Sequence, residues 1–113
     1  MTQGAIDAFV AAGRPLVPMA GEAGNGFLRT WKQYIGVDKF DSVAPIYPPT
    51  MVLTALDTLI AALNGEQVEK VIEIPCNVIT ADTIDQYYRP DLSDAFWCDD
   101  TKLPDSILTT LFE

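Results

Sequence analysis

Apolar positions along the N-terminal part of the chain follow first a helical and then a strand-like pattern. Residues 3–12 repeat apolar positions every three or four residues, which predicts a helix. Gly13 follows this segment and is expected to end the helix as a left-handed cap. Residues 16–20 form a short apolar run between a proline and a glycine, which is typical of a strand.

A glycine-rich turn, residues 21–26, precedes a second helical pattern. Its three glycines are expected to permit backbone angles that other residues resist. Asn25 is a plausible N-cap, because its side-chain oxygen can accept a hydrogen bond from an unpaired helix amide. The residues that share one face of the predicted helix are Phe27, Leu28, Trp31 and Ile35. This shared face places Trp31 in the core.

The strongest helical pattern covers residues 50–63 and ends at Asn64-Gly65. Ten of the thirteen positions from Met51 to Leu63 are apolar, so the apolar surface extends well beyond one face. A helix of this kind is usually buried on more than one side. It is expected either to meet another domain or subunit, or to be the central helix of a small core.

The remaining segments complete an alternation of strands and helices. Residues 42–47 predict a second strand, which Pro45 weakens, and residues 69–74 predict a third. A short helix is expected over residues 80–88 and a last helical turn over residues 104–112. Phe96 and Trp97 are expected to anchor the C-terminal loop. The alternation predicts an α/β fold with parallel strands.

The composition of the chain excludes several classes of function. The chain has 113 residues, which suits one small domain, and a net charge of −9, which argues against nucleic acid as a partner. It contains no histidine, so serine–histidine and cysteine–histidine catalysis are excluded. No carboxylate pair is placed for acid–base work, and the glycines do not match a nucleotide-binding motif. We therefore expect no enzyme and no cofactor.

The C-terminal part is rich in aspartate. These residues lack the alternating spacing of a calcium loop, so we expect a solvated acidic face and no metal site. The aspartates are Asp91, Asp94, Asp99, Asp100 and Asp105. The two cysteines, Cys76 and Cys98, are too far apart for a C-x-x-C motif and are either two buried thiols or one disulfide.

The ends of the predicted strands supply the candidate binding residues. Ligands of open α/β sheets bind just outside the carboxyl ends of strands, and Glu22 and Asn25 follow the first predicted strand. The alternative interpretation is a capped turn that holds no ligand. The chain opens without the basic and apolar regions of a signal peptide, and it contains no apolar run long enough to span a membrane.

The order of these segments resembles the C-terminal part of a sugar-type periplasmic substrate-binding protein of the ribose-binding class, which serves ABC transporters. Residues 1–14 resemble the family's helix of the form GA-x-x-A-x-x-x-AG, and residues 16–22 resemble the strand that ends in a glycine and an acid. Residues 44–49 and 55–68 resemble the hinge strand and the helix that ends L-x-G-E-x-V. Residues 79–88 resemble the tail of one branch of the family.

The resemblance implies a three-layer α/β/α fold with a mostly parallel sheet, which lacks its N-terminal lobe. Residues 1–46 would belong to the C-terminal lobe, residues 47–75 would form the hinge and a helix that packs on the absent lobe, and residues 76–113 would form the tail. The family's Asn-Asp pair, whose aspartate holds sugar hydroxyls, would lie just before Met1. The chain alone is expected to self-associate through residues 50–63.

The resemblance also implies that the protein binds a solute and catalyses no reaction. Two lobes would close on a sugar or similar small polar solute in the periplasm, and an ABC transporter permease would read the closure. Glu22 stands where the family usually has aspartate, and Asn25 and Tyr47 are the other two expected ligand contacts. An oxidising periplasm favours the disulfide between Cys76 and Cys98.

Two functions of other classes remain as alternatives. One is the effector-binding domain of a LacI-type transcription regulator, which shares the fold and which an upstream helix-turn-helix would identify. The other is a small stand-alone α/β interaction module. A receiver-like module of this kind needs an acidic cluster at one strand end, whereas Glu22 is a lone acid there.

Overall fold

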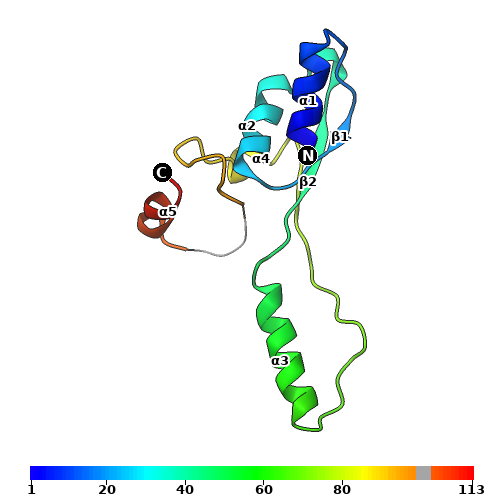
Figure 1. Cartoon of the computed structure of the whole chain (residues 1–113), viewed down its shortest axis with the longest axis vertical. Helices are drawn as coiled ribbons and strands as arrows, with labels where there is room; N and C mark the ends of the chain where they lie inside the picture. Colours follow the sequence, from blue (N-terminus) through cyan, green and yellow to red (C-terminus); the bar gives the residue numbers. More distant parts are fainter. Residues whose placement is uncertain (99–102) are drawn as a thin grey trace.

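The computed structural model describes residues 1–98 and 103–113. Within them, helices and short strands alternate in the first half of the chain, and short helices dominate the C-terminal part (Figure 1). The elements in chain order are α1 (Thr2–Ala11), β1 (Met19–Ala20), α2 (Asn25–Tyr34), the 3-10 turn η1 (Val37–Lys39), β2 (Ser42–Pro45), α3 (Met51–Leu63), β3 (Val78–Ile79), α4 (Ile84–Tyr87) and α5 (Asp105–Leu111).

The strands form one small mixed sheet in the order β1-β2-β3. Met19 pairs with Ser42 in a parallel ladder, whereas Ala44 pairs with Ile79 in an antiparallel one. The α/β class predicted from the alternation is confirmed. A mostly parallel sheet is not, because only the first of these two ladders is parallel, and a three-layer Rossmann-like fold is not confirmed either.

The third strand lies elsewhere than predicted. Residues 69–74 alternate apolar and polar side chains but form no strand, and the antiparallel partner of β2 is instead Val78–Ile79. The physical reason is the place of this segment in the fold, because residues 66–77 run back along α3, away from the sheet (Figure 1). A strand forms only beside a neighbouring backbone that can share its hydrogen bonds. The chain reaches the sheet at Asn77, whose carbonyl accepts a hydrogen bond from the Ile46 amide at 2.8 Å.

The core lies between the sheet and the pair α1 and α2, which lie side by side (Figure 1). Trp31, predicted as a core residue, is fully buried, and its ring centroid is 5.9 Å from that of Phe27. The largest fully buried apolar side chains around it come from α1, α2, β3 and the residues that flank β2. They are Ile6, Leu28, Phe40, Ile46 and Ile79.

Helix α3 extends away from this core as an arm (Figure 1). The predicted helix is confirmed, but none of its residues is buried, so its interpretation as the central helix of a small core is wrong. The molecule measures 59 × 34 × 23 Å, with a radius of gyration of 17.7 Å. A compact chain of this length would have a radius of gyration of about 13 Å. The elongation therefore reflects an apolar helix that lies away from the core, with residues 66–77 alongside it (Figure 1).

The shorter predicted elements are largely present. Gly13 ends α1 with φ of 61°, as the left-handed cap prediction requires. The helix predicted over residues 80–88 shortens to α4, and the last predicted turn forms α5. In the described part of the chain, the helices are all too short or too polar to cross a membrane.

Candidate functional site

A pocket of about 460 Å³ opens where β1 and β2 end. Glu22 follows β1, Tyr47 follows β2, and both line this pocket. Asn25, the third residue predicted to contact ligand, is not part of its lining. The opposite wall comes from the C-terminal segment, through Asp94 and Trp97. Residues far apart in the sequence thus meet at one end of the sheet.

The two strand ends are adjacent because β1 and β2 are parallel. The Gly21 amide donates to the Val43 carbonyl at 2.9 Å, which extends the parallel ladder by one step beyond Ala20. Both Glu22 and Tyr47 are exposed. The sheet therefore brings together two of the predicted site residues at the carboxyl edge that open α/β sheets use for ligands.

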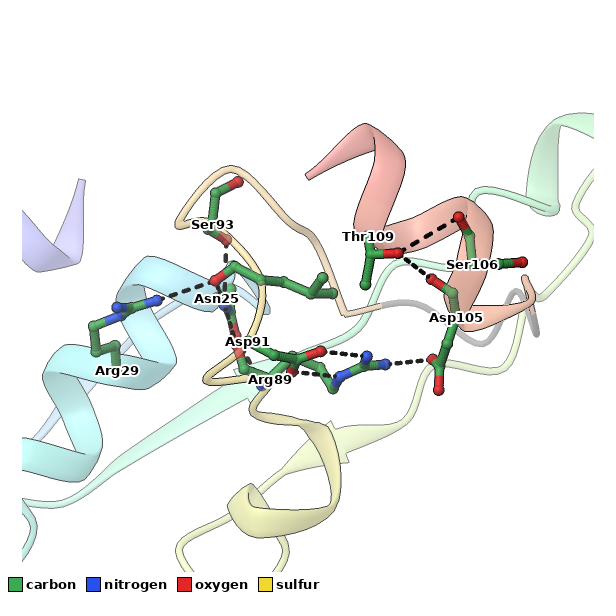
Figure 2. A network of polar contacts seen from close by, with 9 residues as sticks. Asn25, Arg29, Arg89, Asp91, Ser93, Asp105, Ser106 and Thr109 are labelled. Atoms are coloured by element: carbon green, nitrogen blue, oxygen red, sulfur yellow. Dashed lines mark hydrogen bonds and ion pairs between the residues drawn. The ribbon is translucent and has the colours of Figure 1, made fainter. Parts of the chain in front are cut away.

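The side chain of Asn25 is fully buried and holds the loop of residues 89–93 (Figure 2). Its Nδ2 donates to the carbonyls of Arg89, Leu92 and Ser93 at 2.7, 2.9 and 3.2 Å. Its Oδ1 accepts from the Arg89 amide at 3.0 Å. The amide group is thus saturated by backbone groups of its own chain.

The predicted N-cap role of Asn25 is wrong. Gly24 occupies the N-cap position, and no side chain caps the helix. The unpaired amides of α2 donate instead to backbone carbonyls, Asn25 to Phe96 at 2.8 Å and Gly26 to Asp94 at 3.3 Å. The C-terminal segment therefore caps the helix, which leaves the Asn25 side chain to hold residues 89–93.

The same backbone contacts place the far wall of the pocket. The Cys98 amide donates to the Ala23 carbonyl at 2.8 Å, and Gly24 and Trp97 form an antiparallel bridge. Trp97 was expected to anchor the loop as Phe96 does, but it is 50% exposed whereas Phe96 is buried. Residues 23–26 and 94–98 thus form one unit, which presents the indole of Trp97 to the pocket.

The glycines of the turn serve close packing. A Cβ on Gly21 would lie 2.2 Å from the ring of Phe27, and one on Gly26 would lie 2.9 Å from Cβ of Asp94. None of the three glycines, Gly21, Gly24 and Gly26, has a positive φ, so the expected role in unusual backbone angles is wrong for all three. Gly26 instead lets the Asp94 side chain approach α2 closely.

Charged groups near the start of α2 and around Arg89 form ion pairs on the surface, and Figure 2 shows those of Arg89. Arg29 Nε lies 3.0 Å from a carboxylate oxygen of Asp94. The Arg89 guanidinium donates two hydrogen bonds to Asp91, at 2.9 and 2.7 Å, and one to Asp105 at 2.9 Å. The hydrogen bonds from Arg89 lower the pKa of Asp91, and those to Asp91 and Asp105 raise the pKa of Arg89.

The aspartate-rich segment is therefore more than a solvated face. Asp94 lines the pocket, and Asp91 and Asp105 bind Arg89, although all three carboxylates remain partly in solvent. Asp99 and Asp100 lie outside the described residues. No group of three or more metal-binding side chains is assembled within residues 1–98 and 103–113.

The disulfide expected between Cys76 and Cys98 is absent from the structure. Cys76 is exposed on the extended segment that follows α3. Cys98 is buried beside α4, where its thiol donates to the Tyr87 carbonyl at 3.1 Å. The two thiols occupy different environments because the Cys98 backbone is held against Ala23.

The geometry suits capture of a small molecule. The pocket offers carboxylate oxygens as hydrogen-bond acceptors and three aromatic side chains, those of Phe27, Tyr47 and Trp97. Comparison with known protein families, curated proteins and solved structures identified no match. The assignment of function therefore rests on the pocket, the arm and the sequence resemblance.

Proposed function

We propose that this chain is the solute-binding part of an ABC importer, which captures a sugar or similar small polar molecule without chemical change. The observation that carries the proposal is the convergence of Glu22 and Tyr47, from two adjacent strand ends, with Trp97 on one pocket. Specific small-molecule sites combine a few placed polar groups with apolar and aromatic surface. The chain has no histidine, which excludes serine–histidine and cysteine–histidine hydrolysis.

In the proposed mechanism, carboxylate oxygens accept hydrogen bonds from solute hydroxyls, and the Trp97 ring covers an apolar face of the solute. A second lobe closes over the open side of the pocket, and the closed form is recognised by a membrane permease. This reading assigns the full-length protein to the periplasm. The chain alone supplies one side of the proposed two-lobe cleft. Its dissociation constant for the solute is therefore expected to be about millimolar, which corresponds to a binding free energy near −4 kcal/mol.

The apolar arm supports a two-lobe architecture. Its large exposed side chains include Leu53, Leu56, Leu59 and Leu63, and Leu63 is 77% exposed. Each Å² of apolar surface left in water forfeits roughly 25 cal/mol, so a helix of this composition favours a covering partner. We propose that the second lobe covers α3 in the full protein and that a second copy covers it when the chain is alone.

Self-association through α3 is tested by sedimentation velocity over a range of micromolar concentrations. The chain should sediment as a concentration-dependent dimer or larger species. Leu59→Glu should shift it to a monomer, and Leu103→Glu, which places the same charge at an exposed leucine outside the arm, should not. A monodisperse wild-type monomer would rule out this surface as an interface.

Solute binding is tested by ¹H–¹⁵N NMR of the 113-residue chain with millimolar additions from a panel of monosaccharides. The proposal predicts shifts at the Trp97 indole and the Gly26 amide, with signals of α3 unchanged. Trp97→Ala should abolish the response, and Trp97→Phe should retain part of it. Shifts absent for every solute would reject the proposed site.

A stand-alone interaction module is the second candidate, and the exposed arm is the observation that favours it. Under that reading, α3 would bind another protein and the pocket would be an incidental hollow. The two readings separate in the NMR experiment, because an interaction module predicts no response of the pocket to any monosaccharide. The LacI-type effector domain shares the proposed ligand chemistry and differs in what precedes the chain.

A further inference from the structure

We propose that the preferred ligand of the pocket carries a positive charge, as an amino sugar or a similar hydroxylated amine does. This inference rests on the proposed function and names the solute class of that same site. It follows from the charge of the pocket wall combined with its aromatic surface.

The charged side chains of the pocket wall are all acidic. They are Glu22 and Asp94, and no lysine or arginine side chain lines the pocket within the described residues, although Met1, whose amino group is a cation, also lines it. The chain as a whole carries a net charge of −9, so the long-range field also attracts cations. A neutral solute would use the carboxylates only as hydrogen-bond acceptors, whereas an ammonium group would also gain the ionic attraction.

The two carboxylates differ in availability. Arg29 approaches Asp94 to 3.0 Å from outside the pocket and neutralises part of its charge. Glu22 is exposed and forms no ion pair with any cation in the described part of the chain. Glu22 is therefore the carboxylate that can pair with a ligand ammonium group without breaking an existing contact.

The aromatic rings point to the same ligand class. Tyr47 and Trp97 line the pocket and are 53% and 50% exposed. Cations bind over the faces of tryptophan and tyrosine, and exposed rings beside carboxylates recur in sites for amines and quaternary ammonium groups. One ring can cover the carbon face of a sugar while the other lies near its ammonium group. Carboxylate and ring thus favour one charged ligand over its neutral analogue.

The test compares three matched sugars on the 113-residue chain at one fixed pH of about 6. The probes are glucosamine, its neutral analogue N-acetylglucosamine, and the anion glucuronate. The expected order of affinity is amine, then neutral sugar, then anion, as measured by the shift of the Trp97 indole signal. The preference for the amine should be about three- to fivefold and should fall as salt is added.

The substitution Glu22→Gln isolates the ionic contribution. It keeps the shape of an exposed side chain, so the fold is retained, and it should reduce the affinity for glucosamine to that for N-acetylglucosamine. Asp7→Asn, an exposed charge change on α1 away from the pocket lining, is the matched control and should leave the preference intact. Because Met1 also lines the pocket, the series is repeated with its amino group acetylated, which should strengthen amine binding.

The outcomes separate the inference from the function on which it rests. Equal affinity for the amine and the neutral sugar, or a preference unchanged in Glu22→Gln, would overturn the charge inference and leave the solute site standing. A preference for glucuronate would overturn it in the same way. No response to any of the three sugars would overturn both proposals.

Discussion

Replacement of Asn25 tests how the structure holds the pocket together. The side chain makes four hydrogen bonds to the backbone of residues 89–93. In Asn25→Ala, the three carbonyls keep other donors, because Arg29 still bonds to Leu92 and backbone amides still bond to the other two. The Arg89 amide loses its acceptor. The lost bonds and one unpaired amide predict a loss of about 2–4 kcal/mol in unfolding free energy.

The isosteric variant Asn25→Asp sharpens this prediction. Its carboxylate keeps the bond from the Arg89 amide but turns an oxygen toward three carbonyl oxygens. At neutral pH it should be less stable than Asn25→Ala. Burial and the facing carbonyls raise the pKa of this new carboxyl in the folded state, so the folded state binds the proton more tightly. Stability of this variant should therefore rise as the pH falls from 7 toward 4, opposite to the usual effect of acid.

Urea unfolding followed by circular dichroism measures both variants against wild type. Asn64→Ala, at the exposed C-cap of α3, is the matched control, and it should change the unfolding free energy by less than about 0.5 kcal/mol. The reasoning fails if Asn25→Ala and Asn25→Asp are as stable as this control. Both Asn25 variants should also weaken solute binding, because residues 94–97 follow the loop that Asn25 holds.

Two further predictions concern packing and pH. Gly21→Ala should lower the free energy of unfolding by about 1–3 kcal/mol, because its Cβ would meet the Phe27 ring. Gly4→Ala, at an open position in α1, is the control and should be neutral or stabilising. Thermal unfolding compares the two variants, and equal melting temperatures would refute the packing prediction. Acidification should break the Arg89–Asp91 pair, because the hydrogen bond from Arg89 lowers the pKa of Asp91, so this bond contributes stability above about pH 4 that is lost as the pH falls through the folded-state pKa. Amide signals of residues 89–93 followed from pH 6 to pH 2 should therefore change below about pH 4, and unchanged signals would contradict this linkage.

Helices were predictable from the sequence because their signal is local. The 3.6-residue period located α1, α2 and α3 to within about two residues. The third strand was misplaced because an alternating pattern at residues 69–74 does not reveal which backbone lies beside it. Strand pairing is non-local, and here the extended segment follows α3 instead of the sheet.

The site was predictable only in part, for a similar reason. Glu22 was found because it follows a predicted strand, and Tyr47 was found through the family resemblance; both line the pocket. Asp94 and Trp97 were missed because backbone hydrogen bonds between residues 23–26 and 94–98 place them, and such bonds have no side-chain signature. Asn25 was found as a polar residue at a helix start, but its bonding partners lie more than sixty residues away.

The central claim is that this chain is one part of a two-lobe solute-binding protein. The most direct test is to read the coding sequence upstream of the Met1 codon. The account predicts a long in-frame segment that ends in Asn-Asp and begins with a signal peptide. An in-frame helix-turn-helix would instead identify a transcription regulator. A stop codon immediately upstream would contradict the two-lobe account and leave a stand-alone chain whose arm binds another protein.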